Sequence, residues 1–251
     1  MTDNTRPSYP NPTVVEALCE IGFEAEAPRF ATDFIRVWPH FQEAFPNLEV
    51  HTDLLTSAAG GVVAPGPPLF RTRFSARRES RPVVVQFAPG VFAVSTLAPY
   101  LGWVTFRKDI EEGWQAVQSE WSLLRVNRIV VRYINRVPLP SGSAAEGWLQ
   151  KGDYVARALV EGGGQFHSRV QTGTGTPELT TVSAWHQAGT DPAEAALVVD
   201  MERSLEGEFA ADLEALLGQI DALHDDVWRV FTGLKGPRWD DVLEGKKALK
   251  E

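Results

Sequence analysis

The alternation of apolar and polar positions is strongest between Val126 and Pro140, near the middle of the chain. Successive side chains of a β-strand point to opposite faces of the sheet. One face of this segment is therefore mostly apolar, with Asn127, Ile129, Val131, Tyr133, Asn135 and Val137. The other face combines aliphatic residues with three arginines, Arg128, Arg132 and Arg136. The pattern predicts a long strand with its apolar face buried and its arginines on the opposite face.

A second amphipathic strand is predicted near the N-terminus, from Thr13 to Glu26. Its apolar face holds Val15, Ala17, Cys19, Ile21 and Phe23. Its other face holds Glu16, Leu18, Glu20 and Glu24. Cys19 is the single cysteine of the chain, which excludes an internal disulfide and a multi-cysteine zinc site. Its position on the apolar face predicts a small buried hydrophobic residue.

Helical spacing marks two long segments, 103–124 and 208–233, where apolar residues recur every three or four positions. The first stripe contains Trp103, Phe106, Ile110, Trp114, Val117, Trp121 and Leu124. The second stripe contains Phe209, Leu213, Leu216, Ile220, Leu223, Val227 and Phe231. Three strand candidates precede each helix: 69–77, 82–88 and 91–97, and then 165–172, 178–186 and 196–203. A shorter helical pattern over 31–45 is interrupted by Pro39.

The order of elements is the same in residues 13–125 and 126–234, which suggests two related halves within a single domain of residues 1–251. This order resembles the duplicated helix-grip topology of the TATA-box-binding-protein fold. The resemblance implies an α+β fold with a large curved, mostly antiparallel sheet and two long helices packed on one face. It also implies that the two opening strands lie side by side at the centre. Residues 235–251 are expected to form a C-terminal appendage, anchored by Trp239.

Acidic and basic residues repeat every four positions on the polar faces of the two opening strands. If these strands pair antiparallel, Glu24 comes near Arg128 and Glu16 near Arg136. Cross-strand ion pairs of this kind contribute ~0.2–1 kcal/mol each and fix the register. A charge ladder on a solvated sheet face is one interpretation. In the other, the arginines hold an anionic ligand or an acidic partner segment, helped by Arg71 and Arg73 on the same face of a neighbouring strand.

The overall charge argues against nucleic acid as a partner, because the 251 residues carry a formal net charge of −9. No apolar run approaches the ~18 residues that a membrane-spanning helix needs. The N-terminus has no apolar signal segment, so a cytoplasmic location without membrane association is predicted. His51 and Asp53 have a metal-compatible spacing, but a third ligand is missing from the pattern. No metal or cofactor is therefore predicted.

An enzymatic interpretation depends on His167 and His186, which fall on consecutive predicted strands, and on Asp200 and Glu202 on the next strand. An aligned register would pair a histidine with a carboxylate for general acid–base catalysis. A solvated polar sheet face is the alternative explanation. The cluster of Asp221, His224, Asp225 and Asp226 on the last helix is interpreted as a solvated helix face. The glycine-rich segments 162–164 and 173–175 match no phosphate-binding motif.

Three short motifs resemble a sporadically distributed family of uncharacterised bacterial proteins of about this length. The first is Asn11-Pro12 with Val15-Glu16-Ala17, Glu20-Ile21 and Phe23. The second is Arg-Tyr-Ile-Asn-Arg at 132–136, and the third is Leu223-His224 with Phe231. The family continues past the last helix with a segment containing threonine, leucine and arginine, which Thr232–Pro237 interrupts here. The resemblance implies no established activity, and the patchy distribution associates the family with accessory roles in conflict or defence systems.

The sequence thus favours a non-enzymatic binding or interaction protein that uses the open sheet face or a cavity between sheet and helices. Its partner is expected to be another protein or a small anionic ligand. A small-molecule enzyme with a His–carboxylate pair is the alternative. Association into a homodimer is compatible with either interpretation.

Overall fold

The computed structural model describes residues 8–25, 30–55, 58–59, 62–63, 69–78, 80–88, 90–120, 124–139, 144–162, 165–173, 175–188 and 195–246. Within these ranges, side chains are not described at 25, 30–35, 52–55, 58–59, 62–63, 69–73 and 124. The predicted Trp121 and the side chain of Leu124 therefore lie outside the described part of the chain.

A nine-stranded sheet forms the centre of the molecule, with strand order β2-β5-β6-β7-β1-β8-β11-β10-β9. Every neighbouring pair is antiparallel. The strands are β1 Val14–Ala25, β2 Asn47–Leu55, β5 Leu69–Arg77, β6 Val83–Ala88, β7 Val91–Leu97, β8 Leu124–Pro138, β9 His167–Thr172, β10 Glu178–Gln187 and β11 Ala196–Ala210. The short strands β3 Ala58–Ala59 and β4 Val62–Val63 form a separate pair. The predicted α+β class with one large antiparallel sheet is confirmed.

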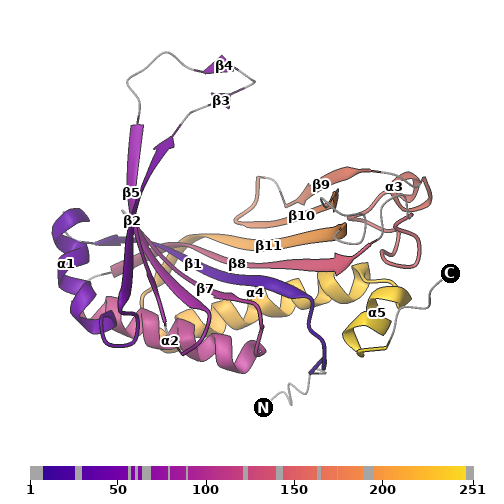
Figure 1. Ribbon diagram of the computed structural model, residues 1–251. Coiled ribbons are helices and arrows are strands. Elements are labelled where there is room, and N and C mark those ends of the chain that lie inside the picture. The colour runs from indigo at the N-terminus through magenta and orange to yellow at the C-terminus, as the bar shows by residue number, and fades with distance from the viewer. Residues whose placement is uncertain are drawn as a thin grey trace.

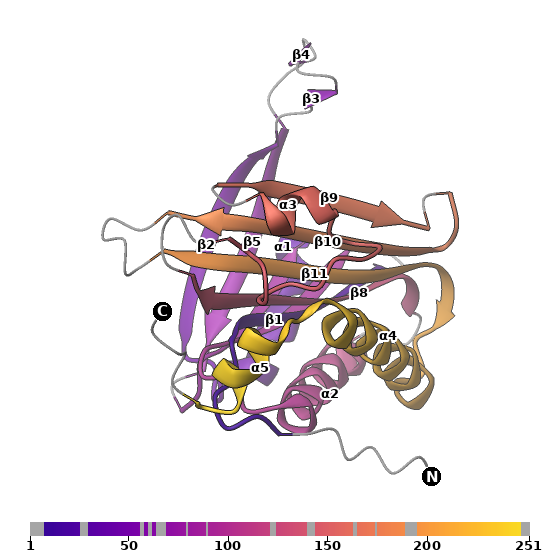
Figure 2. The ribbon, with the colours of Figure 1, turned by 90° about the vertical axis from the view of Figure 1, so that its right-hand side faces the viewer.

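Two long helices lie together on one side of this sheet (Figure 1), and three shorter helices complete the described elements. These helices are α1 Phe30–Phe41, α2 Trp103–Glu120, α3 Arg157–Glu161, α4 Leu213–Leu234 and α5 Pro237–Leu243. The two long helices, α2 and α4, run beneath the central strands, and α3 lies on the outer side of β9 and β10 (Figure 2). The outer strands on both sides curve away from α2 and α4, so the opposite face of the sheet is concave (Figures 1 and 2).

The two opening strands, β1 and β8, are neighbours at the middle of the sheet, as predicted. On one side β1 pairs with β7, which leads into α2. On the other side β8 pairs with β11, which leads into α4. The order of elements is therefore similar in the two halves. A duplication as the origin of this order stays a prediction.

The core lies between the sheet and the two long helices. The predicted apolar face of β1 is buried, with Ala17, Cys19, Ile21 and Phe23 at 5% exposure or less. Phe106, Ile110, Trp114 and Val117 of α2 pack against it, together with Leu216, Ile220, Leu223, Val227 and Phe231 of α4. Burial of such large side chains stabilises the fold by roughly 1.5–3 kcal/mol each. No helix in the described part of the chain is long and apolar enough to cross a bilayer.

The predicted start of the last helix is wrong, because β11 continues to Ala210 and α4 begins only at Leu213. Phe209, assigned to the helical stripe, instead lies opposite Val126 in the sheet. Asp212 sets the true start, since its side chain accepts a hydrogen bond of 3.0 Å from the backbone N–H of Ala215. Phe209 fits the helical spacing of Leu213 and Leu216 although it belongs to the strand. The spacing of apolar residues therefore could not show where β11 ends.

Asn127 is exposed, although the alternation placed it on the buried face of β8. The pairing of β1 with β8 shifts between Gly22 and Phe23, which leaves Asn127 as an extra residue in β8. In the part of β8 that precedes the shift, each side chain points to the opposite face from the one that the alternation predicts. Val126 is therefore buried and Arg125 is exposed. A Cβ on Gly22 would lie 2.7 Å from Asn127 Oδ1, so this glycine allows the irregularity.

The C-terminal segment is tied to the N-terminus through Trp239, which is fully buried as its predicted anchoring role requires. Trp239 Nε1 donates to Thr13 Oγ1 at 3.0 Å, and Thr13 Oγ1 donates to Asn135 Oδ1 on β8 at 3.0 Å. The backbone N–H of Asn11 donates to the carbonyl of Leu243 at 3.0 Å. The described part of the predicted appendage is thus packed into the fold.

Candidate functional site

The concave face of the sheet carries a central charged strip along β1, β8 and β11. The registers place its members in three adjacent rows: Glu16 and Glu20 on β1, then Arg128, Arg132 and Arg136 on β8, then Asp200, Glu202 and Glu206 on β11. The row of arginines therefore lies between two rows of carboxylates. Of the predicted ligand-binding residues, three belong to this strip.

The glutamates and arginines of the two central strands do meet, but in a different register from the predicted ladder. Arg128 lies opposite Gly22 rather than Glu24, and its Nη1 is 2.5 Å from Glu20 Oε1. Its Nε lies 3.9 Å from Glu206 Oε1 on the other side. The register from Glu16 to Gly22 is offset by two residues from the predicted ladder, and the irregularity beside Gly22 then places Glu24 opposite Arg125. Sequence spacing alone reveals neither change.

The central arginine, Arg132, binds the carboxylate of Asp200 rather than a glutamate of β1. Arg132 Nε donates to Asp200 Oδ1 at 2.8 Å, and Nη2 donates to Oδ2 at 2.6 Å. This bidentate geometry is the strongest form of an arginine–carboxylate contact. The hydrogen bond to Asp200, with further carboxylates near it, raises the pKa of Arg132. The carboxylate predicted for the alternative acid–base site is thus engaged by Arg132.

The remaining predicted anion-binding arginines are dispersed. Arg136 has an exposed side chain at the end of the strip, and its backbone N–H donates to the carbonyl of Thr13 at 2.9 Å. Arg71 and Arg73 lie on β5, opposite Asp53 and His51 of β2. Strand β5 is separated from β8 by β6, β7 and β1, so it is not the neighbouring strand that the sequence suggested. The side chains of Arg71 and Arg73 lie outside the described part of the chain.

The structure does not bring His167, His186 and Asp200 together. His167 lies on the edge strand β9, opposite Trp185, and shares the concave face with Asp200. Two strand spacings, roughly 10 Å, separate their strands. His186 follows Trp185 in β10 and therefore points to the other face of the sheet, where it is buried. Asp200 is also occupied by Arg132. The predicted residues His167, His186 and Asp200 therefore form no His–carboxylate pair for acid–base chemistry.

His186 is surrounded by the core on the helix side of the sheet. Both of its ring nitrogens are buried, and neither has a hydrogen-bond partner within the described structure. The indole N–H of Trp148 is buried in the same way. A buried polar group without a partner destabilises the folded state. His186 therefore fits a packed core position better than a catalytic one.

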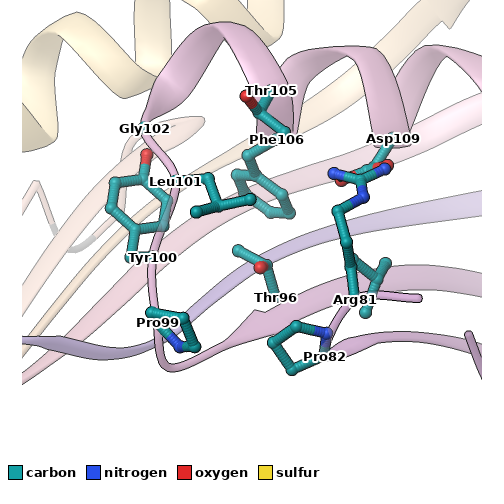
Figure 3. A pocket seen from close by; sticks show the side chains of 11 residues that line it. Arg81, Pro82, Thr96, Pro99, Tyr100, Leu101, Gly102, Thr105, Phe106 and Asp109 are labelled. Carbon is teal, nitrogen blue, oxygen red and sulfur yellow. The ribbon is translucent and has the colours of Figure 1, made fainter. Parts of the chain in front are cut away.

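A small hollow lies between the end of β7 and the first two turns of α2 (Figure 3). Its empty volume is about 220 Å³ including the open solvent above it. Arg81 and Asp109 close one end, and their side chains form a bidentate ion pair in which Arg81 Nη1 donates to Asp109 Oδ2 at 3.0 Å. Arg78 Nη1 also donates to Asp109, at 3.2 Å. Because Asp109 is held by two arginines, its role is to join the turn before β6 to α2.

The polar cluster on the last helix is mostly a contact region between the two long helices, which corrects its interpretation as a solvated face. His224 is buried and stacks on Trp103 of α2, with ring centroids 3.8 Å apart and an interplanar angle of 5°. Asp221 accepts hydrogen bonds from Trp103 Nε1 at 3.1 Å and from Arg107 Nε at 3.0 Å. Asp226 accepts from Arg203 Nε of β11 at 2.9 Å.

Residues of the second and third sequence motifs meet in this cluster, since the rings of Tyr133 and His224 have centroids 5.7 Å apart. The hydroxyls of Tyr133 and Tyr100 lie 3.0 Å apart. The spacing of Trp103 within its apolar stripe could have indicated burial, but not its histidine partner, which is 121 positions away in the chain. The cluster fixes α2 and α4 to each other and to β8.

The described residues contain no group of three or more His, Cys, Asp or Glu side chains that could hold a metal ion. Comparison with models of protein families gave no match, and comparison with curated proteins gave none either. The resemblance to the sporadically distributed bacterial family therefore stays a prediction. The geometry alone identifies the central charged strip as the candidate functional site.

Proposed function

We propose that this protein is a non-enzymatic interaction protein that binds a partner protein on the concave face of its sheet. The observation that supports this best is the fixed alternation of charge in the central charged strip. Arg128 and Arg132 are held in place by carboxylates from the strands on either side. Fixed charges of alternating sign give an interface its specificity and orientation more than its affinity.

A small anionic ligand is the less favoured occupant of this face. An anion approaching Arg132 would have to displace the bidentate carboxylate of Asp200. At Arg128 it would compete with Glu20 and meet Glu206, whose side chain is 72% exposed. Both sites place negative charge where the ligand would bind. A protein surface can accommodate such a mixed pattern with complementary charges of its own.

The proposal includes a cytoplasmic location and an accessory role in a bacterial conflict or defence system, both of which rest on the sequence. Association into a homodimer also stays a prediction. Native mass spectrometry of the full chain would report it directly.

The test is cross-linking of the full chain in its own host, followed by mass spectrometry of the adducts. Two charge-reversal variants serve as a matched pair. Glu206→Lys changes an exposed residue of the strip, and Glu214→Lys changes an exposed residue of α4 on the helix side. A partner that is lost from the first variant and kept by the second supports the proposal. A partner kept by Glu206→Lys but lost from Glu214→Lys would assign binding to the helix side instead.

A further inference from the structure

We infer that the partner segment received by the concave face is basic, an inference that rests on the function proposed above. The strip between Glu16 and Glu206 holds five carboxylates and three guanidinium groups. Its formal charge is therefore negative, in the same sense as the net charge of −9 of the whole chain. A cationic segment is the electrostatic complement of such a strip.

The internal ion pairs show which charges remain for a partner. Arg128 and Arg132 already have carboxylate partners. The Arg132 side chain donates two hydrogen bonds to Asp200, although Glu202 lies directly opposite Arg132. Glu206 is only weakly engaged, at 3.9 Å from Arg128. Glu202 and Glu206 of β11 are consequently the charges most accessible to an incoming group.

An aromatic side chain lies further along this row, on the adjacent strand β10 and beside Asp200. Trp185 of β10 is opposite Val198 of β11, on the concave face, and is partly exposed. The next two residues on this face, Ser183 of β10 and Asp200 of β11, also lie opposite each other. The Asp200 carboxylate is therefore diagonally across from the indole of Trp185. The ring of His167 contacts Trp185 edge-on, with centroids 6.1 Å apart. An extended segment that places one basic residue at Glu202 can place another over Trp185, about 13 Å further along the strand direction, where it gains a cation–π contact.

The positive charge must come from a protein segment rather than from a metal ion. The carboxylates of the strip are distributed along two strands with arginines between them, so they do not converge on one point. Several separated cations on one flexible backbone match this spacing. An extended segment with basic residues at intervals is therefore the occupant that the face fits.

The experiment uses the full-length protein labelled with ¹⁵N and two ten-residue probes, one rich in lysine and arginine and one rich in glutamate. Amide chemical-shift changes locate each probe on the protein. We expect the basic probe to shift amides of β1, β8, β10 and β11. Raising the salt concentration should weaken this binding, because screening reduces interactions between exposed charges.

A matched pair of neutral double variants separates local from overall charge. Glu202→Gln/Glu206→Gln removes two charges from the strip, and Glu43→Gln/Glu214→Gln removes two exposed charges outside it. We expect the first variant to weaken binding of the basic probe about fivefold and the second to change it little. Trp185→Leu should weaken it as well, without changing the net charge.

The outcomes distinguish this inference from the proposed function. Shifts caused by the acidic probe on the same strands would overturn the basic partner and leave the concave face as the binding surface. Shifts by the basic probe confined to other elements, or equal weakening in both double variants, would also overturn it. Loss of partner cross-links in Glu206→Lys would then still support the proposed function.

Discussion

The guanidinium of Arg132 on β8 binds the carboxylate of Asp200 on β11 through two hydrogen bonds of 2.8 and 2.6 Å. Asp200 retains 15% of its side-chain exposure and Arg132 retains 39%. The pair is therefore only partly accessible to water. Asp200 is the more buried partner, so its charge depends more on the hydrogen bonds within the pair than the charge of Arg132 does. It joins the central strand of the sheet to the strand that leads into α4.

Removing Arg132 should destabilise the protein more than the loss of an ion pair between two exposed side chains does. We expect Arg132→Ala to lower the free energy of unfolding by about 1–2 kcal/mol, because Asp200 keeps its charge without its partner. In the double variant with Asp200→Ala, the two losses should be less than additive by about 1 kcal/mol. Urea unfolding at neutral pH measures both values. The exposed pair Arg157–Glu161 within α3 is the control and should show a smaller coupling.

Gly113 allows α2 to approach the sheet closely. A Cβ at this position would lie 2.6 Å from Cζ of Phe92, a buried ring that also stacks on Phe41. We expect Gly113→Ala to destabilise the protein by about 1–3 kcal/mol, because the enclosed ring cannot move away. Gly218→Ala on α4 is the control, since nothing lies within 4 Å of its added Cβ. That change should stabilise by about 0.5–1 kcal/mol in the same thermal unfolding experiment. Equal effects of the two substitutions would contradict the close contact.

Much of the fold follows from short-range pattern. The alternation in β1 and β8 identified both strands and most of their buried faces, because strand geometry links side-chain direction to position in the chain. Their adjacency was instead implied by the order of elements, which resembles the helix-grip topology. The stripe of α2 was correct over most of its length for the same reason, since Phe106, Ile110 and Trp114 repeat with the helical period and are all buried. Its last member, Leu124, is instead the first residue of β8. Boundaries were less accurate, as the continuation of β11 to Ala210 shows.

The partners within the candidate site could not be predicted from the pattern. Arg132 and Asp200 are 68 positions apart, and their contact depends on how β8 and β11 align after the whole second half has folded. Arg128 lies opposite Gly22 rather than Glu24 because the pairing of β1 with β8 is offset by two residues from the predicted one. The extra residue Asn127 then places Glu24 opposite Arg125. A single-residue shift changes every later pairing, so only the three-dimensional register determines which charges meet.

The two buried histidines should respond differently to an apolar replacement. His186 has no hydrogen-bond partner for either ring nitrogen within the described structure, so His186→Leu should leave stability unchanged or raise it by about 1 kcal/mol. His224 stacks on Trp103, so His224→Leu should lower stability by about 1–3 kcal/mol. Urea unfolding of both variants under identical conditions makes the comparison. A large loss for His186→Leu would show that the imidazole makes an essential contact and would reopen the enzymatic interpretation.

Cys19 is predicted to be unreactive in the folded protein. It is 1% exposed on the buried face of β1, and burial raises the pKa of its thiol. The thiolate is the reactive form, so a raised pKa and a closed core both oppose modification. We expect a thiol reagent to label the native protein only as fast as it unfolds globally, and to label it at once in concentrated urea. As it is the single cysteine, one labelling signal reports one site. Rapid labelling without unfolding would mean that the sheet opens locally at β1.

The contact between α1 and α2 should depend on acidity through Glu120, the last residue of α2. Its carboxylate lies 2.8 Å from His40 Nε2 and 3.1 Å from Arg36 Nε, both on α1. The hydrogen bond with His40, together with the charge of Arg36, lowers the pKa of Glu120. A carboxyl group with a lowered pKa stabilises the folded state above its ordinary pKa of about 4.3, and this contribution is lost as the pH falls through the lowered value.

Hydrogen exchange of the α1 amides tests this dependence. In the wild-type protein, protection of α1 relative to α4 should decrease as the pH is lowered below about 4, after correction for the intrinsic exchange rate. Glu120→Gln should show weaker protection at neutral pH and little further change on acidification. Glu111→Gln, on the same helix but paired with Arg107 instead, is the control and should keep the wild-type profile. If Glu120→Gln retains the full acid-dependent loss, other carboxylates must hold α1 in place.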